Sequence, residues 1–191
     1  MPYHFTNTEL IVAAVVLVFV AIAVVEYFLH RKAKTASLRN RFGSEYDLAV
    51  HEHGSSQKAE AKLADRETHV DTLKIRELGA TERERFITEW QGVQSRFVDH
   101  PKTAVTQADE LIAALLEARG YPKDTFEQRA ADVSVTHPRV VNDYRVAHAI
   151  AVRTQGAEAS TEELRTAMIQ FRAIFEELVQ VQNAQEKRPA A

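Results

Sequence analysis

Cysteine is absent from the 191 residues of this chain. The absence excludes disulfide bonds, thiolate metal sites and cysteine nucleophiles. Glycine is scarce, with six residues at positions 43, 54, 79, 92, 120 and 156. Because no two of these are close together, the sequence holds no phosphate-cradling loop, dinucleotide-binding fingerprint or nucleophile elbow. Alternating strand patterns are also nearly missing, so the sequence predicts an all-α protein.

Negative charge outweighs positive charge in most of the chain. There are 27 acidic and 24 basic residues in all, and two acidic and five basic residues precede Phe42. The remainder therefore carries 25 acidic and 19 basic residues, a net charge of -6. Because an acidic surface repels phosphate groups, no nucleic-acid partner is expected.

One long apolar run stands near the N-terminus. Leu10 to Val25 is sixteen apolar residues without a break, and Tyr27 to Leu29 extend the run beyond Glu26. Twenty helical residues rise about 30 Å, the thickness of the bilayer's hydrocarbon core. A cleaved signal peptide needs a basic segment before its apolar run, and residues 1–9 contain no Lys or Arg. The sequence therefore predicts a single transmembrane helix over 10–29, with Glu26 near the interface.

Basic residues follow this run directly. Arg31, Lys32 and Lys34 are expected to set the membrane topology, because positive residues beside a span remain in the cytoplasm. The prediction is a single-pass protein of the cell (inner) membrane, with its N-terminus outside and its C-terminal domain cytoplasmic. The bilayer is thus the first expected partner, and anionic lipid would attract the same charges.

The rest of the chain divides by composition and by helix signals. We expect a short external N-terminus over 1–9, a basic juxtamembrane linker over 30–43 and peripheral charged helices over 44–80. A helical bundle core is predicted over 81–180, followed by a disordered tail over 181–191.

Helix start and stop signals support this division. Ser56 is expected to cap a helix from Gln57 to about Leu73, and Thr81-x-x-Glu84 and Ser160-x-x-Glu163 match capping boxes. Further helices are expected to start at Pro101, near Asp124 and at Pro138. Five helices between Glu82 and Val179 would bury their apolar faces against one another as a bundle.

No catalytic residue, metal site or cofactor is predicted. A di-iron bundle requires Glu-x-x-His pairs, and none of the eight histidines has Glu three residues before it. The best candidate ligand-binding residues are Arg129, His137, Tyr144 and His148. They could serve acid–base or anion-binding chemistry if the fold brings them to one pocket. The alternative, a neutral core histidine at position 148, remains open.

Several strings give a further indication: Arg41-Phe42-Gly43 with Glu45-Tyr46-Asp47, Trp90-x-x-Val93-Gln94-x-Arg96-Phe97-Val98-Asp99, Gly120-Tyr121-Pro122, Phe126 to Val135, His137-Pro138 and Tyr144-Arg145-x-Ala147-His148. With these strings the chain resembles a family of uncharacterised bacterial proteins that have one N-terminal transmembrane helix and a cytoplasmic helical domain. The resemblance covers Leu38 to about Val179. It implies a bacterial source and an anchored helical domain, and it implies no reaction.

Three functions follow as hypotheses. The first is a membrane-tethered helical interaction or adaptor domain with a protein partner, which is more in keeping with the missing motifs than an enzyme. The second is a small-ligand binder or enzyme that uses the polar residues of 126–148. The third is an accessory subunit of a membrane complex, in which the span and Glu26 would make the contact.

Overall fold

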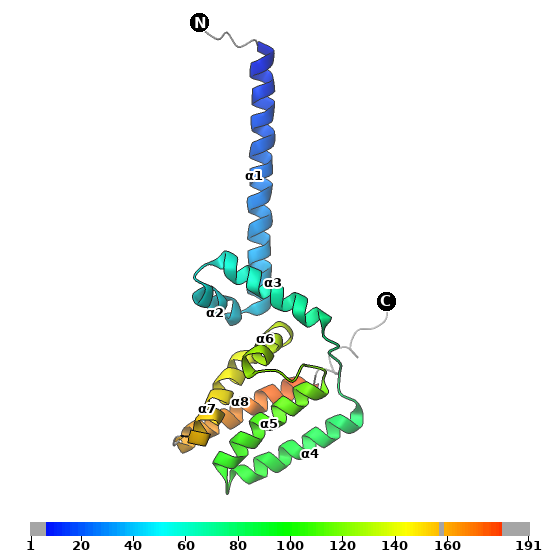
Figure 1. The fold of residues 1–191 in the computed structure, drawn as a ribbon, viewed down its shortest axis with the longest axis vertical. Coiled ribbons are helices and arrows are strands. Elements are labelled where there is room, and N and C mark those ends of the chain that lie inside the picture. The colour runs from blue at the N-terminus through cyan, green and yellow to red at the C-terminus, as the bar shows by residue number, and fades with distance from the viewer. Residues whose placement is uncertain (1–6, 157–158, 181–191) are drawn as a thin grey trace. The chain divides into compact units, whose positions relative to one another are not determined.

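The computed structural model confirms the all-α fold. It describes the backbone of residues 7–156 and 159–180 and, within these, every side chain except those of residues 7–15, 34, 155 and 180. The predicted tail over 181–191 and residues 1–6 of the predicted external segment lie outside the described residues. The described part forms helices and no strand: α1 (Asn7–Phe42), α2 (Ser44–His53), α3 (Ser56–Thr72), α4 (Ala80–Phe97), α5 (Pro101–Ala118), α6 (Phe126–Thr136), α7 (Val141–Gly156) and α8 (Thr161–Gln180) (Figure 1).

The chain forms two compact units, residues 1–41 and residues 42–191. The described part of the first unit is one continuous helix from Asn7, so the predicted juxtamembrane linker is helical as far as Phe42. Among the residues whose side chains are described, no helix is both long and apolar enough to cross a membrane. Residues 10–15, the start of the predicted span, are outside those described side chains.

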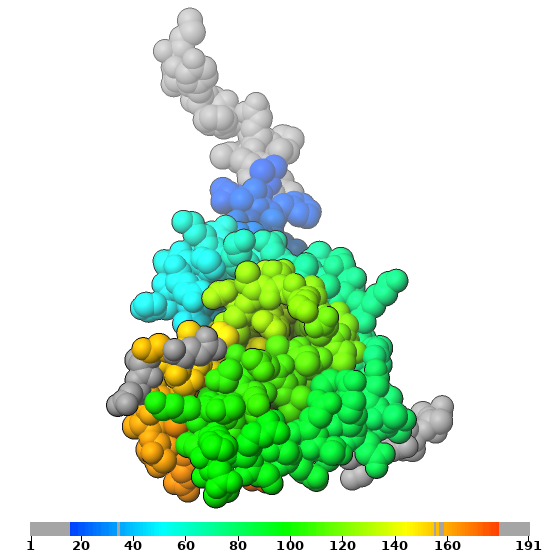
Figure 2. Space-filling model, turned by 60° about the horizontal axis from the view of Figure 1, so that its bottom comes forward, coloured from blue at the N-terminus to red at the C-terminus, as the bar shows by residue number. Residues whose placement is uncertain are grey.

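The second unit is built around α5, which packs against α4, α7 and α8. Helices α7 and α8 pack along each other, and α6 lies against both α7 and α3 (Figure 1). Helix α2 pairs with α3, so these two helices are joined to the rest of the unit through α6 and α7. Figure 2 shows α6 filling the surface between α3 and α5.

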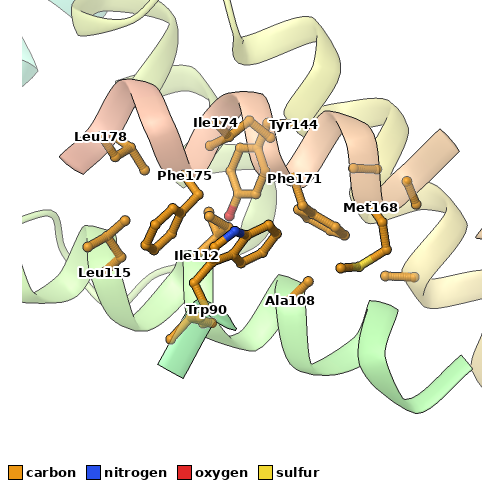
Figure 3. Close-up of a cluster of buried hydrophobic side chains, with 14 of the residues drawn as sticks. Trp90, Ala108, Ile112, Leu115, Tyr144, Met168, Phe171, Ile174, Phe175 and Leu178 are labelled. Atoms are coloured by element: carbon orange, nitrogen blue, oxygen red, sulfur yellow. The ribbon is translucent and has the colours of Figure 1, made fainter. Parts of the chain in front are cut away.

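Aromatic and aliphatic side chains fill the space between α4, α5, α7 and α8. The rings of Trp90 and Phe175 stack with their centroids 4.9 Å apart, and Phe171, Ile112 and Tyr144 are almost completely buried beside them (Figure 3). Each large side chain buried in this way contributes about 1.5–3 kcal/mol to the free energy of unfolding. The 3.6-residue spacing of these positions in the sequence is what builds the bundle core.

Helix ends confirm some of the predicted caps and correct others. The Ser160 box is present, because Ser160 N–H donates to Glu163 Oε2 at 2.8 Å and Glu163 N–H donates to Ser160 Oγ at 3.3 Å. The predicted Thr81 box is wrong: α4 begins two residues earlier, with Gly79 as N-cap and its N–H bonded to Glu82 at 3.0 Å.

Two other predicted starts are shifted. Ser55, one residue before the predicted Ser56, caps α3. The helix predicted to open at Pro138 begins at Val141, because residues 138–140 form a turn closed by the Val140 N–H and the His137 carbonyl.

Gly120 ends α5 in a conformation that only glycine adopts easily. Its φ is +95°, and a Cβ there would lie 2.4 Å from the carbonyl oxygen of Lys74. The close approach arises because the 73–79 connection runs beside the end of α5, where Arg76 N–H donates to the Arg119 carbonyl at 2.8 Å. This glycine thus allows the α3–α4 connection to lie on α5.

Candidate functional site

Three helices bring a group of polar and aromatic side chains together at the start of α6. The start is fixed by Thr125, whose Oγ1 accepts a hydrogen bond from Gln128 N–H at 3.3 Å. Phe126 then faces α7, where its ring stacks on the His148 imidazole with centroids 3.6 Å apart. The same ring meets Tyr144 edge-on at 5.0 Å. Two residues of α7, one helical turn apart, therefore share one aromatic partner.

Helix α5 supplies the acid of this group. Asp109 lies 2.9 Å from His148 Nδ1 through Oδ2 and 3.0 Å through Oδ1. Both side chains are 22% exposed. A carboxylate in this position fixes the orientation of the imidazole ring. We call Asp109, Phe126, Arg129, Tyr144 and His148 together the His148 cluster.

Arg129 and Tyr144 complete the cluster electrostatically. Burial raises the pKa of Tyr144 well above its usual range, while the nearby Arg129 charge lowers it and the Asp109 charge raises it. The Tyr144 hydroxyl therefore stays protonated at every physiological pH. Arg129 Nη2 reaches the Asp124 carbonyl only at 3.5 Å, and its Nε is buried without a hydrogen-bond partner. The cluster thus contains an oriented imidazole, a neutral phenol and a guanidinium whose buried Nε–H has no hydrogen-bond acceptor.

His137, the fourth predicted site residue, lies elsewhere. It ends α6, and its Nε2 is 3.2 Å from Nη1 of the buried Arg119. Its Nδ1 is 3.5 Å from Glu177. Burial and the Arg119 charge lower the pKa of His137, and Glu177 opposes this shift. Since Arg119 also donates to the Leu178 carbonyl at 3.2 Å, this pair joins α5 and α6 to the end of α8.

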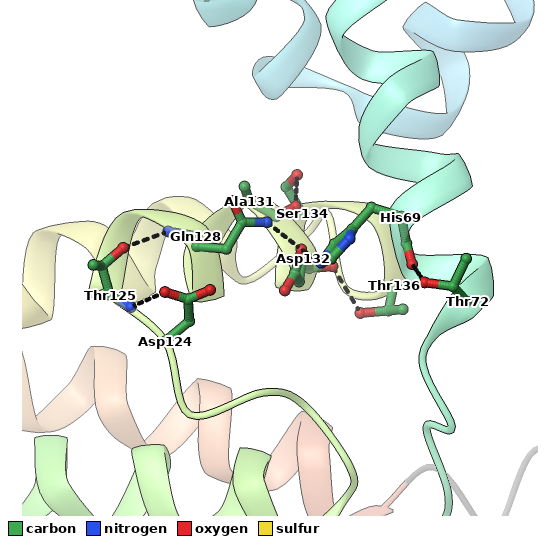
Figure 4. Close-up of polar contacts among 9 residues, drawn as sticks. All are labelled: His69, Thr72, Asp124, Thr125, Gln128, Ala131, Asp132, Ser134 and Thr136. Atoms are coloured by element: carbon green, nitrogen blue, oxygen red, sulfur yellow. Dashed lines mark hydrogen bonds and ion pairs between the residues drawn. The ribbon is translucent and has the colours of Figure 1, made fainter.

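Asp132 is a buried acid on α6. Its side chain is fully buried, and Oδ1 accepts from Gln128 Nε2 at 2.9 Å while Oδ2 has no hydrogen-bond partner. His69 of α3 approaches it to 3.7 Å, as Figure 4 shows. Burial is the largest cause of a raised pKa for Asp132, with Gln128 and His69 acting in the opposite direction. This contact joins α3 to α6.

Glu45 is another buried acid, at the first turn of α2. It forms a close ion pair with Arg145 of α7, and Arg66 of α3 lies 3.9 Å from its other oxygen. These two ion pairs connect α2 to α3 and α7. They are structural contacts, since both guanidinium groups are directed at the one carboxylate.

An open groove runs along α7 and α8. It has a volume of about 610 Å³ and a largely apolar floor that includes Val146, Ala149 and Ile150. Arg153 and Glu163 pair across it at 2.7 Å. No three metal-ligating side chains of the described residues stand close enough to hold an ion.

Sequence reasoning identified part of the His148 cluster and missed its acid. Arg129, Tyr144 and His148 are together in the fold, and His137 is apart from them. Asp109 was missed because it stands 39 residues from His148 on another helix, next to the buried Ala108. The only available signal was a carboxylate beside an apolar stripe, and this pattern is common in amphipathic helices.

No protein-family model, curated protein or solved structure matches this chain. The strings that carry the resemblance noted from the sequence include residues of every polar group described above. Arg129, Tyr144 and His148 belong to the His148 cluster, and Glu45 and Asp132 are two of the buried acids. These residues join helices to one another, so their first role is to hold the second unit together.

Proposed function

We propose that this chain is a single-pass membrane protein whose tethered helical domain binds a protein partner. The observation that carries the proposal is the apolar surface of α1. Leu17, Phe19 and Leu29 are 69%, 67% and 62% exposed. At about 100° per residue they stand on different sides of the helix. An apolar surface on every side calls for an apolar surrounding medium, and a bilayer provides one.

Two further observations support the tether. The hydrophobic core cluster of the second unit is formed by residues between Leu78 and Val179 and contains no residue of α1. Arg31 and Lys32 follow the apolar segment and are exposed. On the positive-inside rule they put the C-terminal domain in the cytoplasm and the N-terminus outside.

Membrane integration is tested by extraction of membranes with alkaline carbonate. The full chain is expected to resist extraction, and Val20→Asp to weaken integration, because a carboxylate near the middle of a span costs about 2.5–3.5 kcal/mol. Val152→Asp is the control, since Val152 is exposed to a similar extent (51% against 54%) but lies on α7. Release of the unmodified chain by carbonate would contradict the tether.

The groove between α7 and α8 supports the partner-binding half of the proposal. An apolar floor with a charged rim suits the apolar stripe of a partner helix. A photo-crosslinking residue at Val146 should give one discrete adduct in cells, and Ala149→Arg should abolish it, because Ala149 is exposed and lines the groove. The same residue at Ile87 of α4, which is 37% exposed against 39% for Val146, is the control. Equal adducts at both positions would argue against a specific groove.

The His148 cluster favours a second candidate, binding of a small anionic ligand. Arg129 supplies a guanidinium with an unpartnered buried Nε, and Asp109 fixes the orientation of His148. A thermal-shift screen with small carboxylates and phosphates should then find a stabilising compound. Arg129→Gln should remove the shift, and Arg172→Gln, which changes an exposed side chain of α8, should keep it. A screen with no stabilising compound would leave the cluster a purely structural contact.

A further inference from the structure

Basic and apolar side chains share one face of α1 just after the apolar run. Phe28, Arg31, Lys32, Thr35 and Arg39 line a shallow hollow there together with Ala36. At about 100° per residue, the first five of these positions fall within about 100° of one another. The face thus presents an aromatic ring followed by cations, in the order in which a membrane lipid presents its acyl chains and its headgroup.

Distances along the helix axis agree with that order. If Leu29 marks the edge of the hydrocarbon, Arg31 and Lys32 stand about 3 and 4.5 Å beyond it at a rise of 1.5 Å per residue. The headgroup layer of one leaflet is about 5–8 Å thick, so both positions fall within it. Helical side chains also lean toward the N-terminus of their helix. For α1 this direction is toward the apolar run.

The charge of this segment is entirely of one sign. The sequence contains no acidic residue between Glu26 and Glu45. The Arg31 and Lys32 side chains are exposed in the first unit. Guanidinium and ammonium groups bind phosphate through charge-assisted hydrogen bonds, which are about twice as strong as neutral ones.

We infer that the face of α1 formed by Phe28, Arg31, Lys32, Thr35 and Arg39 is a binding site for the phosphate headgroup of an anionic membrane lipid. The inference rests on the proposed tether and goes beyond it. General attraction of a basic segment to a negative membrane involves all the charges of the segment equally. A site on one face depends on the cations of that face.

Two lysines allow a lipid site on one face of α1 to be distinguished from general attraction of the basic segment to a negative membrane. Lys32 is on the proposed face, and Lys34 stands two residues further, about 3 Å along the axis and about 200° around the helix. Lys32→Gln and Lys34→Gln therefore remove the same charge at almost the same depth. The full chain, purified in detergent, would be titrated with phosphatidylglycerol or phosphatidylcholine, and bound lipid counted by native mass spectrometry.

The unmodified chain should bind phosphatidylglycerol at least fivefold more tightly than phosphatidylcholine. Lys32→Gln should weaken phosphatidylglycerol binding about fivefold, the effect of one cation at a membrane surface, and Lys34→Gln should change it less than twofold. Inorganic phosphate at the same concentration should not displace the lipid.

Three results would overturn the inference: equal loss in both lysine variants, no preference between the two lipids, or displacement of the lipid by inorganic phosphate. Carbonate extraction of the same variants separates this failure from that of the tether. A chain that resists extraction but shows no lipid preference contradicts the lipid site alone. A chain released by carbonate contradicts the tether as well.

Discussion

Single residues in this domain have effects that their exposure alone does not reveal. Gly120 has an exposed position, yet it faces the backbone of Lys74 so closely that no Cβ fits. Asp132 and His137 are ionisable groups whose surroundings shift their pKa in the direction of the neutral form. Substitution of any of these three residues should therefore change the free energy of unfolding measurably.

Gly120→Ala is expected to lower the free energy of unfolding by about 2–5 kcal/mol. The positive φ and the overpacking against Lys74 each contribute a share of this loss. Gly92→Ala is the control: Gly92 lies inside α4, where the nearest atom to an added Cβ is an Arg96 side-chain nitrogen at 3.9 Å. Because alanine favours helix, that variant should gain about 0.5–1 kcal/mol. Urea unfolding of both variants measures the difference, and equal effects would contradict the role of Gly120.

Asp132→Asn should raise stability at neutral pH. A carboxyl whose pKa is higher in the folded than in the unfolded state binds its proton more tightly when folded. Its ionisation therefore lowers stability as pH rises above the unfolded pKa, near the ordinary value of 3.8. The gain of Asp132→Asn should disappear below that pH. Thermal unfolding between pH 3 and pH 7 tests this, and a loss of stability at pH 7 would show that the contact with His69 outweighs burial.

His137→Gln should reduce the loss of stability in mild acid. The pKa of His137 is lower in the folded than in the unfolded state. The neutral imidazole therefore contributes its full share of the folding stability above the ordinary pKa of 6.5, and this share is lost as pH falls below that value. The unmodified chain should thus lose more stability between pH 7 and pH 5 than the variant does. His51→Gln, which changes an exposed side chain of α2, is the comparison. It should lose as much stability between pH 7 and pH 5 as the unmodified chain.

At the scale of elements, the sequence predicted which segments form helices, but it did not predict which helices contact one another. The apolar stripes of α4, α5 and α8 have a helical period that packing preserves, so these helices were predictable. The Thr81 cap was wrong because Arg76, in the preceding loop, pairs with Glu82 at 2.7 Å and holds it against Gly79. The Asp109–His148 contact joins separate helices, and no periodicity within one helix indicates such a partner.

Attachment of α2 depends on Glu45, whose exposed fraction is 2%. Glu45→Gln is expected to lower the free energy of unfolding by about 1–3 kcal/mol, less than for a fully buried pair because Arg145 is 27% exposed. Hydrogen exchange should quicken in α2 before it does in α8. Glu162→Gln, in a 3.5 Å pair with exposed Arg165, should change stability by no more than about 0.5 kcal/mol. Unchanged exchange in α2 would exclude Glu45 as its attachment.

At the scale of the whole molecule, the division at residue 42 separates two environments. The first unit exposes apolar side chains, and the second holds a core of its own. A chain of residues 42–191 should therefore fold with a helical circular-dichroism spectrum and a cooperative thermal transition. It should also leave the membrane fraction. A truncated chain without a cooperative transition would contradict the independence of the second unit.

The ion pair between Glu45 and Arg145 also fixes an order in time. The two residues are 100 positions apart in the sequence. Ribosomes add about 5–20 residues per second, so Glu45 is synthesised about 5–20 seconds before its partner. During that interval Arg66 of α3 is the only one of Glu45's two arginine partners that has been made. The attachment of α2 to α7 is therefore completed only after most of this domain has left the ribosome, however early α2 itself forms its helix.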